Sequence, residues 1–65
     1  MNHAIKEAID IVGSQQKLAF LVGTKQSTVS KWLRGSEIKA RYIEKIELAT
    51  KGKVSVYEIL KSLSY

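Results

Sequence analysis

The chain has 65 residues, of which 45% are hydrophobic and 26% charged, and it contains no cysteine and no proline. This length permits one small domain, which would bury only about 60% of the surface that its unfolded chain exposes. The lack of cysteine excludes a disulfide framework and a thiolate metal site. No apolar run approaches the roughly 18 residues that cross a bilayer, and MNHAIKEAID lacks the pattern of a signal peptide, so we expect a cytoplasmic protein.

The net charge of +5 is concentrated in the middle of the chain. Residues 15–42 hold a single acid, Glu37, whereas basic and acidic residues balance elsewhere. The basic residues of this window are Lys17, Lys25, Lys31, Arg34, Lys39 and Arg41. A lysine-rich surface can simply keep a small domain soluble. The concentration of basic residues within 15–42 favours instead a surface that binds a polyanion.

The first predicted helix runs from His3 to Val12. Its apolar residues follow helical spacing: Ile5, Ala8, Ile9 and Val12. Asn2 is a suitable N-cap, and Gly13 can adopt the backbone conformation that ends a helix.

Residues 15–34 have the pattern of two short helices joined by a tight turn. Ser14 can cap a helix from Gln15 to Val22, and Gly23 ends it at once. Thr24 is the expected N-cap of a third helix over residues 25–34. The residues predicted to hold the pair together are Leu18, Ala19, Val22, Gly23, Val29 and Trp32. A small residue, a glycine and an aliphatic residue at these spacings fulfil the steric needs of a DNA-binding helix-turn-helix.

Two further helices are predicted in the C-terminal half. Residues 38–53 present an apolar stripe of Tyr42, Ile43, Ile46 and Ala49. Residues 55–63 begin with Ser55 and Glu58 in the spacing of a capping box. A strand is the alternative for this last segment because Val54 and Val56 alternate with polar residues, but the adjacent Ile59 and Leu60 favour a helix. The predicted fold class is therefore all-α, a compact five-helix single domain over residues 1–65.

Two stretches resemble a known family. GSQQKLAFLVGTKQSTVSKWLRG resembles the helix-turn-helix of Cro and lambda-type phage repressors, and IKARYIEKIELATKGKVSVYEIL resembles the tail of bacterial Cro/YdaS-type regulators. Together they cover residues 13–60. The chain departs from the family pattern at Thr24, where the residue is usually larger and aliphatic, and at Lys51, which replaces the first glycine of a turn. The resemblance implies a lambda-repressor-like domain with a helix-turn-helix over 15–34 and a C-terminal packing or dimerisation segment over 53–65.

The resemblance also implies roles for individual residues. Gln16 would bind a phosphate and brace Gln26 at the start of the recognition helix, and Ser27 would contact a base edge or a phosphate. The chemistry agrees, because a carboxamide matches the donor and acceptor of adenine in the major groove. Two solvated glutamines are the alternative.

The full set of predicted DNA contacts extends these roles. Base contacts are expected from Lys25, Gln26, Ser27, Thr28, Ser30 and Lys31. Phosphate contacts are expected from Gln16, Lys17, Arg34, Lys39 and Arg41, each of which has a solvated surface role as its alternative. The candidate dimer contacts are Tyr57, Leu60, Leu63 and Tyr65, although Leu60 and Leu63 could equally cover the core of the monomer.

These observations predict a transcriptional repressor that binds a double-stranded DNA operator as a homodimer, formed in solution or only on DNA. An enzyme, a metal and a cofactor are not expected, since His3 is the single histidine, no glycine-rich phosphate loop is present, and Glu44 with Glu47 is interpreted as a charged helix face. The alternative is an antitoxin-like or adaptor module that acts through a protein partner. The Phe20 side chain could be a contact site for such a partner, but we expect it to pack at the edge of the core.

Overall fold

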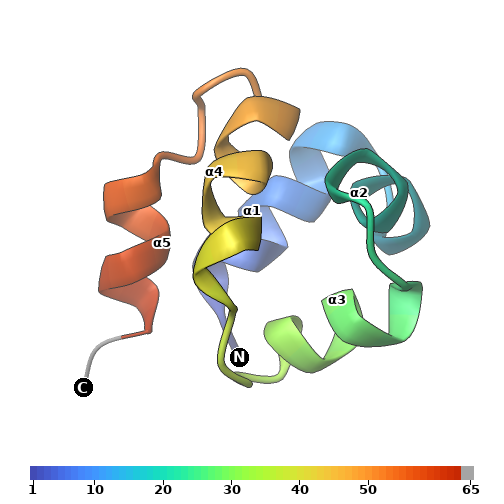
Figure 1. Cartoon of the computed structure of the whole chain (residues 1–65), viewed down its shortest axis with the longest axis horizontal. Coiled ribbons are helices and arrows are strands. Elements are labelled where there is room, and N and C mark those ends of the chain that lie inside the picture. Colours follow the sequence, from blue (N-terminus) through green and yellow to red (C-terminus); the bar gives the residue numbers. More distant parts are fainter. Residues whose placement is uncertain (64–65) are drawn as a thin grey trace.

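The computed structural model describes residues 1–63, and this part of the chain contains helices joined by turns and short loops, with no strand. The five helices are α1 (His3–Val12), α2 (Gln15–Val22), α3 (Gln26–Leu33), α4 (Ala40–Ala49) and α5 (Val56–Ser62). Figure 1 shows α1 and α4 in the middle of the molecule, with α5 on one side and α2 and α3 on the other. The predicted all-α fold with five helices is confirmed, and the strand alternative for the last segment is wrong.

Side-chain caps explain where three of the helices begin. Each capping oxygen accepts a hydrogen bond from the backbone N–H three residues later, which satisfies a group that the helix itself leaves unpaired. The pairs are Asn2 with Ile5 at 3.0 Å, Ser14 with Lys17 at 3.1 Å, and Ser55 with Glu58 at 3.0 Å. The bounds predicted for α1 and α2 are confirmed. They were predictable because the capping residues Asn2 and Ser14 can be recognised in the sequence.

The start of α3 differs from the prediction. Its N-cap is Lys25, which makes no side-chain capping bond, so the assignment of that role to Thr24 is wrong. The backbone N–H of Thr24 bonds the carbonyl oxygen of Ala19 at 2.9 Å and so still belongs to the end of α2. Gly23 makes this possible through a left-handed backbone, with φ 78° and ψ 38°. Gly23 itself is exposed, so it contributes to the turn and not to the buried core.

Helix α4 is shorter than the predicted 38–53. Ile38 lies in the loop before it, yet only 4% of its surface is exposed. At the other end the buried Thr50 organises the turn, since its hydroxyl donates to the carbonyl oxygen of Glu47 at 3.0 Å and accepts from the N–H of Val54 at 3.1 Å. Lys51 follows with φ 55°, a conformation that favours glycine, at the position where the related pattern has one.

Glu47 has a structural role that the sequence interpretation missed. Its carboxylate accepts a hydrogen bond at 3.0 Å from the backbone N–H of Val56, the first residue of α5. A negative charge at the positive end of a helix is favourable. The interpretation of Glu47 as part of a solvated charged face is therefore wrong, whereas Glu44 is exposed as expected.

The core draws on all five helices and on two residues outside them. Its buried apolar members are Ala4, Ile5, Ala8, Val12, Leu18, Ala19, Val22, Val29, Trp32, Ile38, Ile43, Ile46, Val54 and Ile59. The list includes every predicted helix-turn-helix core residue except Gly23. No helix in the described chain is long and apolar enough to cross a membrane.

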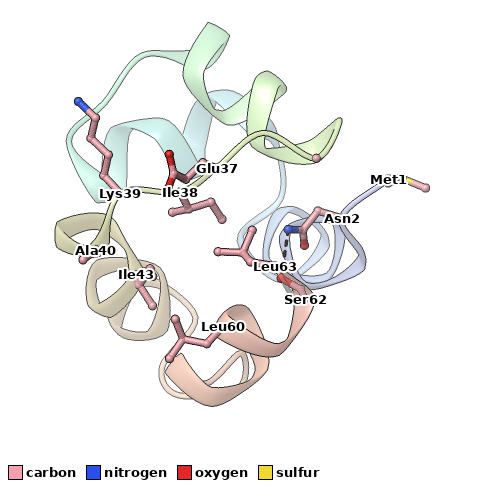
Figure 2. Close-up of a pocket in the computed structure, with 11 residues that line it drawn as sticks. Met1, Asn2, Glu37, Ile38, Lys39, Ala40, Ile43, Leu60, Ser62 and Leu63 are labelled. Carbon is pink, nitrogen blue, oxygen red and sulfur yellow. Dashed lines mark hydrogen bonds between the residues drawn. The ribbon is translucent and has the colours of Figure 1, made fainter. Parts of the chain in front are cut away.

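The buried Asn2 joins three parts of the fold. Its backbone N–H bonds the carbonyl oxygen of Leu33, the last residue of α3, at 2.8 Å. Its side-chain nitrogen donates to the hydroxyl of Ser62 at the end of α5, at 3.1 Å (Figure 2). The ends of α3 and α5 are thus tied to the start of α1.

Candidate nucleic-acid interface

Helix α3 is fixed to the core along one face. Val29 and Trp32 are buried, and the rings of Trp32 and Tyr42 from α4 pack at 5.4 Å between centroids with a 53° tilt. The backbone N–H of Ser36 bonds the carbonyl oxygen of Lys31 at 3.0 Å and closes the end of the helix. With both the buried face and the end held, the opposite face of α3 has a defined orientation.

The predicted base contacts all lie on α3 or its N-cap, but they differ in exposure. Lys25, Gln26, Ser27 and Lys31 are exposed. Thr28 and Ser30 are half-buried, which limits how far each can reach from the helix. The face therefore offers an amide, a hydroxyl and two amines as its accessible groups.

The predicted phosphate contacts come from three helices. Gln16 and Lys17 lie in the first turn of α2, Arg34 ends α3, and Lys39 and Arg41 lie at the start of α4. All five are exposed. In Figure 2 the amine of Lys39 points away from the cavity beneath it, toward the outside of the molecule.

These cations have no carboxylate partner among residues 1–63. The ion pair found there joins Lys6 and Asp10 on α1, at 3.3 Å and on an exposed surface. Arg41 instead lies over the ring of Tyr42, 5.2 Å from its centroid. A set of exposed, unpaired cations is the electrostatic arrangement that attracts a polyanion.

A small pocket of about 250 Å³ adjoins α3 and brings several of these residues together. It is lined by Thr24, Thr28, Lys31, Trp32, Ser36, Glu37, Lys39 and Tyr42. A side-chain hydrogen bond with Thr24 lowers the pKa of Tyr42, and the positive charges of Arg41 and Lys45 lower it further. The Thr24 side chain thus links the turn to α4 instead of capping α3.

Tyr42 and Lys45 belong to this surface although neither was predicted to. The amine of Lys45 lies 5.9 Å from the centre of the Tyr42 ring. Lys45 follows Arg41 by four residues, which places both on one side of a helix. This four-residue spacing was visible in the sequence. Lys45 was missed because it lies outside the basic window of residues 15–42.

The opposite side of the molecule carries acidic groups. A side-chain hydrogen bond with Glu58 of α5 and the charge of that residue raise the pKa of Glu7 on α1. Two carboxylates held together in this way repel an anion. The described residues contain no group of three His, Cys, Asp or Glu side chains placed to hold a metal ion.

The predicted dimer contacts fall into three classes. Leu63 is half-buried and packs against the core. Tyr57 and Leu60 on α5 are 71% and 51% exposed. Tyr65 lies outside the described residues. Leu60 and Leu63 also line a cavity of about 940 Å³ between the end of α5, the loop before α4 and the start of α4 (Figure 2).

Phe20 on α2 is 81% exposed, so the expectation that it packs at the edge of the core is wrong. Leu18, Ala19 and Val22 fill the buried side of this short helix. The aromatic ring therefore points to solvent.

Comparison with known proteins supports the resemblance seen in the sequence. The model of the family described as "Bacterial toxin YdaS" matches residues 5–62. A protein of Escherichia coli (strain K12) described as "Putative transcriptional regulator YdaS" is 31% identical over 65 residues, which cover 98% of this chain and 66% of that protein. The chain thus spans slightly less than two thirds of the relative's length. No solved structure matches the chain. On the match over residues 5–62, the chain belongs to the YdaS family.

Proposed function

We propose that this protein is a sequence-specific repressor that binds double-stranded DNA through α3 in the major groove. The observation that carries the proposal is the outer face of α3, where Gln26, Ser27 and Lys31 are exposed on a helix held by buried Val29 and Trp32. Amide, hydroxyl and amine groups match the hydrogen-bonding edges of base pairs. The name of the Escherichia coli relative, a transcriptional regulator, supports this function.

The surrounding cations support a specific docking geometry. Residues from the starts of α2 and α4 flank α3, so phosphates on both sides of the groove would meet a donor. Gln16 and Lys17 lie in the first turn of α2, and Lys39 and Arg41 lie at the start of α4. Base contacts from α3 would then determine which DNA sequence is recognised, and the flanking contacts would determine the position and orientation of the domain.

We also propose that two copies bind one operator. A domain of this size makes few base contacts, and two-fold-related half-sites with centres about 34 Å apart would supply the missing affinity. Tyr57 and Leu60 are exposed on α5, and Leu60 lines the cavity at the end of that helix, which makes this surface the best candidate for the contact between copies.

Selection from a random pool of duplex DNA tests the proposal. Duplexes of roughly 30 base pairs admit more than one half-site spacing, and binding is selected at near-physiological salt. The expected result is a two-fold-symmetric motif that the wild-type chain binds much more tightly than random DNA. Enrichment of a single, unrepeated half-site would contradict binding as a dimer but would still support sequence-specific DNA binding.

The second candidate function is an antitoxin-like or adaptor module. The exposed Phe20 and the family description as a bacterial toxin favour it. Binding of DNA that depends on salt but enriches no motif would support this alternative over the repressor. Such a result would mean that the basic surface holds phosphate without recognising sequence.

A further inference from the structure

A second concave surface lies away from the outer face of α3, at an edge formed by the ends of α1 and α4 and by α2. It is a groove of about 410 Å³. Its lining residues are Ile11, Val12, Lys17, Leu21, Ala49, Thr50, Lys51 and Lys53, and none of them comes from α3. We call it the α1–α2–α4 groove.

The floor of the α1–α2–α4 groove is apolar. Ile11 and Leu21 are 38% and 45% exposed, and Ala49 lies between them and the turn after α4. Thr50 adds no free polar group there, because its hydroxyl is already bonded to the backbone of the turn. An exposed apolar surface of this kind marks a site of contact with another molecule.

Exposed apolar residues also lie next to the groove in the sequence. Phe20 precedes the lining residue Leu21 and is 81% exposed, and Leu48 precedes Ala49 and is 75% exposed. Phe20 contacts a neighbouring depression that also includes Lys17, so the two hollows share a residue. The exposed Phe20 therefore lies close to the groove, through the Lys17 side chain that lines both hollows.

The groove has a uniform charge. Lys17, Lys51 and Lys53 line it, and no acidic residue does. None of these lysines pairs with a carboxylate within residues 1–63. An occupant that brings carboxylates would therefore meet three unpaired amines around an apolar floor.

We propose that the α1–α2–α4 groove binds an acidic, apolar segment of a protein partner. Leucine- or phenylalanine-like side chains would fill the floor at Leu21 and Ala49, and Asp or Glu side chains would pair with Lys51 and Lys53. DNA fits the lysines but gains nothing from the apolar floor. A membrane surface would meet both kinds of group, but a concave groove suits an inserted side chain better than a flat lipid surface. This binding site contains none of the proposed base contacts of α3, and Lys17 is the one proposed phosphate contact that also lines it.

Display selection with random peptides of roughly 11 residues, or three helical turns, tests the proposal on the whole chain. The expected peptides combine Asp or Glu with Leu, Ile or Phe. Their affinity should fall roughly tenfold or more with Leu21→Ser and with Lys53→Glu, as for a central interface residue. A matched control should leave it unchanged: Lys6→Glu makes the same charge change as Lys53→Glu on α1, outside the groove.

A second measurement needs no variant. On addition of a selected peptide to ¹⁵N-labelled wild-type protein, the amide signals of Ile11, Leu21 and Ala49 should shift, and those of Gln26 and Ser27 should not.

Three results would overturn the proposal. The first is enrichment of peptides that lack acidic residues or that bind the Leu21→Ser protein unchanged. The second is sedimentation with phosphatidylglycerol vesicles that Leu21→Ser abolishes, which would assign the groove to a membrane. The third is self-association that the same substitution abolishes, which would assign it to a second copy of the chain.

Discussion

The outer face of α3 and the surface shared by α1 and α5 differ in whether their charged side chains have charged partners. Around α3 the cations are exposed and lack carboxylate partners among the described residues. On α1 and α5, Lys6 pairs with Asp10, and the Glu58 side chain holds the Glu7 carboxyl group at a raised pKa. The excess positive charge of the chain is therefore concentrated around α3, which makes this the side of the molecule that attracts a polyanion. Four experiments test this contrast.

The largest effect is expected from removing the anchor of the α3 face. Trp32→Ala deletes a buried ring that packs on Tyr42, and should lower the free energy of unfolding by about 3–5 kcal/mol. Tyr57→Ala on α5 removes an exposed aromatic ring and should change it by less than about 0.5 kcal/mol. Urea denaturation followed by circular dichroism measures both. Similar losses in the two variants would show that Trp32 does not anchor α3.

The next effect concerns sequence recognition by α3. Gln26→Ala should weaken binding to the selected operator by about 1–3 kcal/mol and relax the preference at one base pair. Binding to random duplex should change little, because phosphate contacts remain. Fluorescence anisotropy on both duplexes gives the comparison. An equal loss on both would remove Gln26 from the set of base contacts.

A smaller effect is expected from one phosphate contact. Lys39→Ala should weaken binding to all sequences similarly and reduce the slope of log K against log salt by about one unit per monomer. Lys6→Ala, on the acidic side, is the matched control and should leave the slope unchanged. Titrations across a range of salt concentrations measure the slopes. If the two variants behave alike, the contrast between the two surfaces has no role in DNA binding.

The smallest effect concerns the acidic side. In the folded state the pKa of Glu7 is raised above its ordinary 4.5, so the folded protein binds this proton more tightly than the unfolded chain does. The resulting contribution to stability is present below pH 4.5 and is lost as the pH rises through the raised pKa. Glu58→Gln removes the neighbouring charge and should reduce this loss. Thermal unfolding of both proteins between pH 4 and 7 tests it, and parallel curves would show that the two carboxylates do not interact.

The sequence predicted those features whose causes are local. Asn2 and Ser14 mark the starts of α1 and α2 because a capping oxygen acts within three residues of its own position. The burial of Val29 and Trp32 followed from helical spacing, which orients side chains without knowledge of the fold. The outward direction of Lys31 followed in the same way, whereas Gln26 was assigned to the recognition face by the resemblance to lambda-type repressors.

The remaining features depend on contacts between distant segments. Thr24 had the chemistry of an N-cap, but its side chain lines a pocket together with Tyr42, eighteen positions along the chain. Ile38 is buried although it lies in a loop, and Glu47 caps a helix that begins nine residues later. Phe20 is exposed because three other residues of the short α2 already fill its buried side. Whether the predicted base and phosphate contacts touch DNA stays a prediction.

The hydrogen bonds of Asn2 have a consequence for how the domain opens. This residue links side chains 60 positions apart in the sequence, and its backbone also holds the end of α3. The contact closes the chain into a loop, so α5 cannot detach without disturbing the support of α3. A fragment containing the helix-turn-helix alone would lack that closure. Local unfolding at either chain terminus and loss of the fixed orientation of α3 are therefore expected to be a single cooperative event.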